Sequence, residues 1–281
     1  MLRRRIRVRD AVREVVGGVR QRASASDVMV VAAAMTCYAV FGLVPLLAIG
    51  TRVAAALLGE HEVIRTGAGV ARFVPGPIHL DRGIVTFTHA AAGASWWGVL
   101  AALVPASLYA EGTVRSLERF SGAPERRSRS LRGRALTVVF VALVLAVVLT
   151  LVAAVRPLLF DPFGHGTGPR LLGILVAFNV LFFAAVTTLA LIYRLFASTP
   201  IRVGPLLFAA GAAASWFAGQ TLGYVAAVRV IDGFAHAYGG YDAAAAIAAL
   251  AFLAYLLHLV VLLGYALALQ LHEYPLPRLD G

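Results

Sequence analysis

The sequence predicts an all-α, polytopic membrane protein with six transmembrane helices and a basic amphipathic N-terminal helix. Hydrophobic residues make up 60% of the 281 positions, more than a soluble protein could cover with polar surface. Long runs without Asp, Glu, Lys or Arg recur, and two of them, 203–228 and 243–271, each exceed the roughly 20 apolar residues that cross a bilayer as a helix. The 25 basic residues, all of them arginine, gather beside such runs.

The first 23 residues form the predicted cytoplasmic amphipathic segment. Helical spacing places a group of valines on one face and most arginines on the others, which favours a helix lying on the cytoplasmic leaflet. A cleaved signal peptide is the alternative interpretation. We expect the helix to be retained, because the next apolar run is too long for a signal peptide and lacks a cleavage site. The valines are Val8, Val12, Val15, Val16 and Val19.

Residues 24–273 form the predicted six-helix transmembrane domain, and 274–281 form a cytoplasmic tail. Ser26 and Asp27 are suited to cap the first span, and Pro45 is expected to bend its outer end. The polar loop 51–89 is predicted to lie outside the membrane and to contain one short helix, about 63–73. The predicted spans are about 28–50, 90–110, 135–155, 171–193, 203–228 and 243–271.

The distribution of arginine predicts the topology. With six spans, both termini lie on one side of the membrane. That side carries 18 of the 25 arginines, in the N-terminus, the 111–134 loop, the 194–202 turn and the tail, and the opposite loops carry seven. The positive-inside rule therefore places both termini in the cytoplasm.

Five polar residues fall near the centres of the predicted spans. At 1.5 Å per residue they lie within a layer on the order of 6 Å either side of the midplane. Polar groups at this depth are costly and often mark a solute path, so they form a candidate polar path between the helices. The alternative is that each bonds locally and holds neighbouring helices together. They are Thr36, Tyr38, Asn179, Gln220 and His258.

Small residues recur at every fourth position of the fifth span. We define this small-residue ladder as Gly211, Ser215, Gly219, Gly223 and Ala227. Such spacing lets another helix approach closely, so a helix-packing role is favoured. A sliding surface, or a narrow gap for a substrate chain, is the functional alternative.

Neither catalysis nor a cofactor is expected. The sequence holds no Ser/His or paired-Asp arrangement, no zinc-ligand spacing and no Gly-rich phosphate loop. Four residues on the predicted outer side could approach a metal ion, but their spacing is non-specific and no metal site is predicted: Asp161, His165, Asp232 and His236.

The expected partners are the lipid bilayer and its anionic headgroups, which the arginine-rich segments would attract. Nucleic acid is not expected, since the arginines flank apolar runs. A homo-oligomer is left open.

Several short patterns resemble the YihY/virulence factor BrkB family of bacterial inner-membrane proteins. The resemblance covers roughly 27–272 and is most specific after residue 190. It implies a six-span plasma-membrane protein of poorly defined activity. The residues that carry it are Asp27, Ala32, Ala33, Ala34, Tyr38, Phe41, Leu43, Pro45, Tyr109, Arg115, Leu117, Arg119, Arg132, Arg134, Ile192, Tyr193, Arg194, Pro200, Arg202, Gly211, Ala212, Ser215, Trp216, Tyr224, Tyr238, Gly239, Tyr255, Leu263 and Gly264.

The last span departs from the family pattern. Members commonly read Trp-Leu-Tyr and then Gly-Ala-Glu, whereas this chain has Phe252-Leu-Ala-Tyr255 and Gly264-Tyr265-Ala266. A role for that glutamate is therefore not carried over. The polar layer favours a transporter or flippase for an anionic or lipid-like solute. The alternative is a non-transporting envelope factor that binds lipids or membrane partners, and an intramembrane enzyme is the weakest hypothesis.

Overall fold

The computed structural model describes residues 8–71, 81–121, 138–139, 141–143, 145–146, 167–196, 200–230 and 242–274. Every regular element in these ranges is an α-helix, as the sequence predicts. The helices are α1 (Val8–Ala25), α2 (Val28–Leu58), α3 (Glu60–Ala71), α4 (Asp81–Ala92), α5 (Trp96–Ser121), α7 (Thr167–Phe196), α8 (Val203–Val230) and α9 (Asp242–Glu273).

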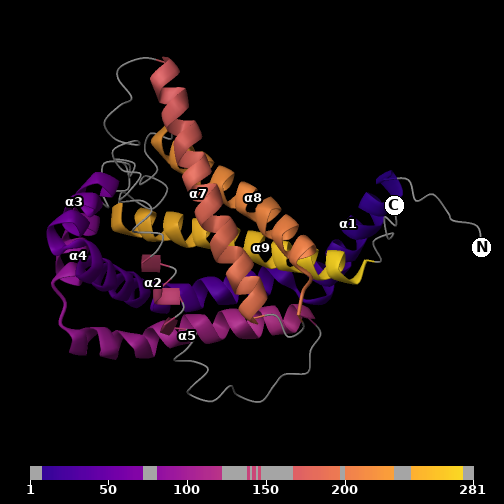
Figure 1. Cartoon of the computed structure of the whole chain (residues 1–281), viewed down its shortest axis with the longest axis horizontal. Helices are drawn as coiled ribbons and strands as arrows, with labels where there is room; N and C mark the ends of the chain where they lie inside the picture. Colours follow the sequence, from indigo (N-terminus) through magenta and orange to yellow (C-terminus); the bar gives the residue numbers. More distant parts are fainter. Residues whose placement is uncertain are drawn as a thin grey trace, which may run out of the picture.

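Three helices lie side by side and form the body of the molecule. They are α2, α5 and α9, and each contacts the other two (Figure 1). Helices α7 and α8 pack as a pair that crosses this layer obliquely, with α8 against α9 (Figure 1). At one end of the body α3 and α4 pack together on α2, and at the other end α1 packs on α9.

Four helices in the described part of the chain are long and apolar enough to cross a membrane. They correspond to Val28–Leu58, Trp96–Ser121, Leu171–Leu195 and Ile247–Glu273. The predicted fifth span is the single helix α8, which is not among these four. Most of the predicted third span, 135–155, lies outside the described residues. Membrane spans are therefore supported, and the count of six stays a prediction.

Two helices extend well beyond the predicted spans. Helix α2 continues through Pro45 to Leu58, and α5 begins at Trp96 and runs to Ser121. Residues 90–92 belong to α4 instead, so the predicted second span 90–110 began one loop too early. The 51–89 loop contains most of two helices, α3 and α4, rather than the single one predicted.

Asp27 occupies the predicted cap position before α2 but does not cap through its side chain. Its backbone is left-handed, with φ 48° and ψ 56°, and its carbonyl accepts from the N–H groups of Val30 and Val31. This conformation turns the chain from α1 into α2 within two residues. Helix α1 exists as a helix in the structure, and its place on a membrane surface stays a prediction.

Gly264 of α9 lies in close contact with both α7 and α8. A Cβ placed there would lie 2.5 Å from the Tyr193 hydroxyl and 2.6 Å from the Ala213 Cβ. Tyr193 is fully buried and donates to the Val261 carbonyl at 2.8 Å. Only glycine lets the three backbones approach this far. The buried face of α8 consists of Leu206 and five alanines: Ala209, Ala210, Ala213, Ala214 and Ala218.

The small-residue ladder lies mainly outside this packed face of α8. Ser215, Gly219 and Gly223 are exposed, and a Cβ built at Gly211 or Gly223 would meet no atom within 4 Å. The side chain of Ala227 is outside the described set. A Cβ built at Gly219 would lie 4.0 Å from the Phe178 ring of α7. The predicted packing role of the ladder stays untested.

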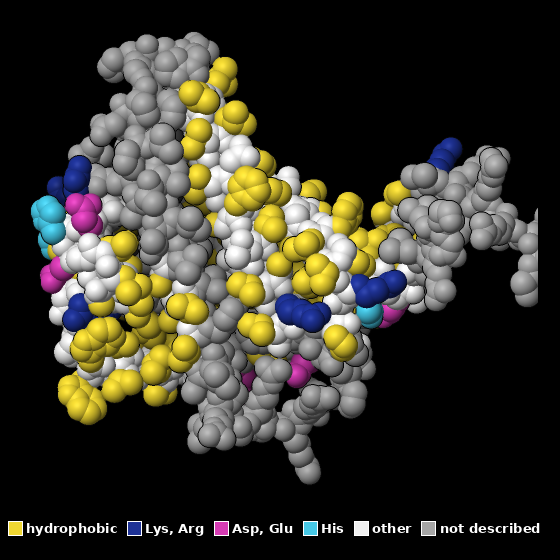
Figure 2. Space-filling model, in the orientation of Figure 1, with side chains coloured by type: hydrophobic (Ala, Val, Ile, Leu, Met, Phe, Trp, Pro, Cys, Tyr) yellow, Lys and Arg dark blue, Asp and Glu magenta, His cyan; other side chains and the backbone are white. Residues whose placement is uncertain are grey.

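The exposed surface of the α7–α8 pair is strongly apolar. Figure 2 shows hydrophobic side chains spread over α7 and α8, with charged side chains mostly toward the two ends. Large exposed residues on this pair include Leu175, Phe183, Phe208 and Trp216. A continuous apolar surface of this kind is expected of a protein that faces lipid.

Candidate functional site

His258 lies at the centre of a polar cluster that joins the three body helices. It comes from α9 and is only 6% exposed. Its Nδ1 lies 3.0 Å from the hydroxyl oxygen of Thr36 on α2, and its Nε2 lies 3.0 Å from that of Tyr109 on α5. We call Thr36, Tyr109 and His258 the hydroxyl–imidazole site.

The hydrogen bonds of this site form one consistent directional chain. Thr36 also lies 2.8 Å from the Ala32 carbonyl and donates to it. Its oxygen is then free to accept from an Nδ1–H of His258, and the Tyr109 hydroxyl can donate to the unprotonated Nε2. A neutral imidazole is thus satisfied at both nitrogens. A protonated ring would present two donors and force Tyr109 to accept instead.

Tyr109 reaches His258 because α2 and α5 pack closely on both sides of it. A β-carbon at Gly42 of α2 would overlap Tyr109, and one at Gly112 of α5 would overlap the Tyr38 ring. These reciprocal glycine–tyrosine contacts fix the register of the two helices. The rings of Tyr109 and His258 meet edge to face, with centroids 5.8 Å apart.

Of the five predicted path residues, the structure brings Thr36 and His258 into contact. Tyr38 instead lies against Gly112, and Asn179 donates to the Leu175 carbonyl of its own helix at 2.8 Å. Gln220 on α8 has a buried Oε1 for which the described residues provide no hydrogen-bond partner. Predicted depth in the membrane thus grouped two residues that are in contact, Thr36 and His258. The other three predicted path residues lie outside the hydroxyl–imidazole site.

Tyr109 was missed by the sequence prediction. We placed the second span at 90–110, so Tyr109 fell at its end. The structure has α5 at Trp96–Ser121, which puts Tyr109 near the middle of the helix. A tyrosine with a polar tip inside an apolar helix was the available signal, because such a hydroxyl usually finds a partner when buried.

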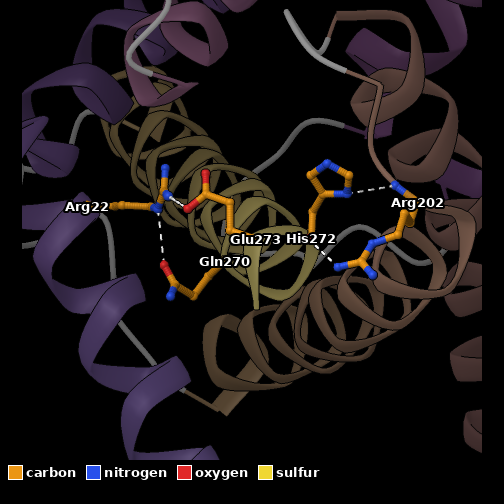
Figure 3. A network of polar contacts seen from close by, with 5 residues as sticks. All are labelled: Arg22, Arg202, Gln270, His272 and Glu273. Atoms are coloured by element: carbon orange, nitrogen blue, oxygen red, sulfur yellow. Dashed lines mark hydrogen bonds and ion pairs between the residues drawn. The ribbon is translucent and has the colours of Figure 1, made fainter. Parts of the chain in front are cut away.

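A second polar network lies where α1, α8 and α9 meet at the end of the body (Figure 3). Arg22 of α1 donates to Gln270 at 3.2 Å and pairs with Glu273. From the opposite side, the backbone N–H of Arg202 donates to Nδ1 of His272 at 3.1 Å. The Arg202 guanidinium donates to the carbonyls of His272 and Tyr274, the latter at 3.2 Å. We call this set the helix-end network.

The helix-end network suits the end of a helix electrostatically. The last carbonyls of α9 have no partners within the helix and carry partial negative charge, which a guanidinium complements. Tyr274 extends the network to α1 through a long contact, 3.5 Å, from its hydroxyl to Glu14. Burial, the charge of Glu14 and this contact raise the pKa of the Tyr274 phenol above its ordinary value of 10.0.

The residues considered for an outer-side metal, Asp161, His165, Asp232 and His236, lie outside the described residues. Within the described ranges no three His, Cys, Asp or Glu side chains gather as a metal site would require.

Comparison with known families places the chain in one family. The model of the family described as virulence factor BrkB matches residues 19–279, which is most of the chain and includes both polar clusters. Comparison with curated proteins and with solved structures finds no match.

Proposed function

This chain belongs to the virulence factor BrkB (YihY) family, and from that premise we propose that it is a membrane transporter or flippase, not an enzyme, for an anionic or lipid-like solute. In this proposal it resides in the bacterial plasma membrane with both termini in the cytoplasm. In this proposal the solute passes between α2, α5 and α9, and the hydroxyl–imidazole site is the polar binding site on that path.

One observation carries the proposal: a buried histidine bridges hydroxyls from two other apolar helices. Polar groups inside a membrane are expensive, and those that face the interior of a bundle often serve a solute or proton path. A histidine is suited to this because each ring nitrogen can exchange donor and acceptor roles. Both neighbours are hydroxyls, which can also exchange these roles, so the cluster could rebond around a passing polar group without losing partners.

The site contains no formal charge of its own when the imidazole is neutral. Neutral hydroxyl and imidazole donors bind an anionic group without a fixed counter-charge that would hold it permanently. The absence of a fixed counter-charge therefore favours release of the solute along the path over tight binding at the site. The lipid-facing surface of α7 and α8 provides the apolar environment that a lipid-like solute needs.

The proposal is tested by flux in proteoliposomes. The purified chain is reconstituted with a fluorescent phosphatidylglycerol, and its transfer between leaflets is followed by quenching from outside. We expect His258→Leu to slow transfer by about tenfold or more, the effect of losing on the order of 1.4 kcal/mol of stabilisation on the path. Thermal unfolding checks that the variant is folded.

Asn179→Leu is the matched control. Asn179 was predicted at the same depth as His258, but among the described residues its hydrogen bond is to Leu175 of its own helix. We expect this variant to transfer lipid at the wild-type rate. Equal rates in wild type and the folded His258→Leu variant would contradict the proposed path and favour the non-transporting envelope factor.

A further inference from the structure

Helix α1 is fixed to the end of α9 along one side only. Arg22 joins Gln270 and Glu273, and a β-carbon at Gly18 would overlap the Gln270 side chain, so the backbone of α1 lies directly on α9 here. Val19 packs against the main hydrophobic core. The docked side of α1 is therefore defined by Gly18, Val19 and Arg22.

The side of α1 next to the docked one carries two uncovered valines. Val12 and Val16 are 55% and 59% exposed. The predicted valine face is thus divided by the structure: Val15 and Val19 turn partly inward and Val12 and Val16 turn outward. Valines this exposed are out of place in water at the end of a membrane protein, where the bilayer surface is close.

Charge is separated across the outward side. At 100° per residue, Arg9, Arg13 and Arg20 follow Val12 and Val16 around the helix, and all three are exposed. The acidic residues Asp10 and Glu14 fall on the far edge, and Glu14 is contacted by the Tyr274 hydroxyl. We call Val12, Val16 and the three arginines the outward face of α1. Its composition complements an apolar surface rimmed by anions.

We propose that the outward face of α1 binds the anionic headgroups and upper acyl chains of the adjacent leaflet, and that the Arg22 clamp transmits this contact to α9. Three arginines near an anionic surface favour binding over a neutral one by on the order of a hundredfold in total. The valines insert between headgroups, and long arginine side chains extend to the phosphates.

The clamp gives this surface contact a consequence for the hydroxyl–imidazole site. Helix α9 carries Gln270 and Glu273 at its end and His258 four turns earlier, on one continuous helix. An α1 held by the leaflet therefore fixes the end of the helix that positions His258. This coupling rests on the proposed transport function, whereas the docking does not. Transport should accordingly respond to the charge of the leaflet.

Docking is tested with an environment-sensitive fluorophore on the full chain. The single cysteine is removed by Cys37→Ser, and the label is attached after Val16→Cys or, as a matched control, Gln21→Cys. Gln21 is also exposed but lies toward the acidic edge. In nanodiscs that contain phosphatidylglycerol we expect a blue shift at position 16 and none at 21, and no shift at either position in phosphatidylcholine alone.

Replacing Arg9, Arg13 and Arg20 together by Gln should abolish the shift without changing the fold, since none of the three forms an ion pair among the described residues. Equal shifts in both lipids, or equal shifts at positions 16 and 21, would overturn the docking proposal.

Coupling is tested by flux in the same two lipid compositions. We expect wild-type transfer to be faster with phosphatidylglycerol, and Arg22→Gln to lose this difference while its label at position 16 still shifts. An Arg22→Gln variant that keeps the lipid dependence would overturn the coupling and leave docking intact. Absence of transfer in every lipid would instead contradict the proposed function, and the fluorescence result would still decide the docking.

Discussion

Two histidines on α9 show how differently one helix can use the same side chain. His258 is buried among hydroxyls of α2 and α5, with both ring nitrogens at 3.0 Å from a partner. His272, at the end of the same helix, is partly exposed and takes part in a network with a charged guanidinium and a backbone N–H. The first joins helices inside the body and the second joins their ends.

The difference follows from the surrounding solvent. In an apolar interior a lost partner leaves a polar atom unsatisfied, at a cost of about 1–3 kcal/mol. At an exposed end water replaces the partner, and charged pairs there contribute about 0–1 kcal/mol. Inner contacts should therefore dominate stability and transport, whereas end contacts should adjust how α1, α8 and α9 are arranged.

The largest effect on stability is expected at Gly264, which lies between the two histidines in the sequence of α9. Gly264→Ala places a methyl group 2.5 Å from the hydroxyl of the buried Tyr193 side chain. The methyl group would also lie 2.6 Å from the Ala213 Cβ, which cannot move without the α8 backbone. Overpacking costs about 1–3 kcal/mol, which exceeds the gain in helix propensity of about 1 kcal/mol. We expect a clearly lower thermal unfolding temperature in detergent.

Gly223→Ala is the matched control on α8. A Cβ at this ladder position meets nothing within 4 Å, so the propensity gain stands alone and stability should stay equal or rise slightly. A loss of stability as large as that of Gly264→Ala would show that the ladder is covered, for example by a second copy of the chain, and crosslinking would then identify the oligomer.

An effect of comparable size separates the two histidines directly. His258→Leu leaves the Tyr109 hydroxyl without its partner and should cost about 1–3 kcal/mol of unfolding free energy. His272→Ala should cost less than about 1 kcal/mol, because Arg202 keeps its carbonyl acceptors and water is close. Unfolding of both variants in one detergent measures the contrast, and equal losses would contradict the distinction between inner and end contacts.

Ionic strength should distinguish the helix-end network from the hydroxyl–imidazole site, with a smaller effect on stability. The Arg22–Glu273 pair has partly exposed side chains, so high ionic strength screens it, whereas the neutral hydroxyl–imidazole site has no charge to screen. We expect Arg22→Gln to lower the unfolding temperature slightly at low salt and hardly at all at high salt. A His258→Leu effect that also vanished in high salt would argue for a charged imidazole.

The smallest effect concerns alkaline pH. The pKa of Tyr274 is raised in the folded state, so the folded chain keeps the phenolic proton where the unfolded chain loses it. The stabilisation is present below about pH 10 and is lost as pH rises through the folded value. Tyr274→Phe should remove this alkaline loss of stability, which unfolding curves between neutral and high pH would measure.

The sequence could predict depth but not rotation about a helix axis. Thr36 and His258 were placed at one depth by counting residues, and the structure joins them. Tyr38 shares that depth, yet two residues turn a helix by about 200°, so it faces away from Thr36. The four-residue spacing of the ladder was also ambiguous, because the neighbouring alanines of α8 repeat with the same spacing and are the ones buried.

The ends of the helices were also not predictable from single residues. Charged residues such as Arg52 and Glu111 suggested ends for the first two spans, but both lie inside continuous helices. A helix that leaves the membrane keeps its backbone hydrogen bonds, so charge marks the interface and not the last helical residue. Because the second span was predicted to end at residue 110, Tyr109 was not included among the predicted site residues.

The most direct test of the central claim is the transfer rate of Tyr109→Phe. This change removes only the hydroxyl that bonds Nε2 of His258 and retains the ring and the Tyr109 Cβ that lies against Gly42. We expect lipid transfer to slow by about tenfold, as for a lost contact of about 1.4 kcal/mol. The free energy of unfolding should fall by about 1–3 kcal/mol, because the buried Nε2 of His258 loses its partner. Wild-type transfer by the folded variant would show that the hydroxyl–imidazole site holds helices together and is not part of a transport path.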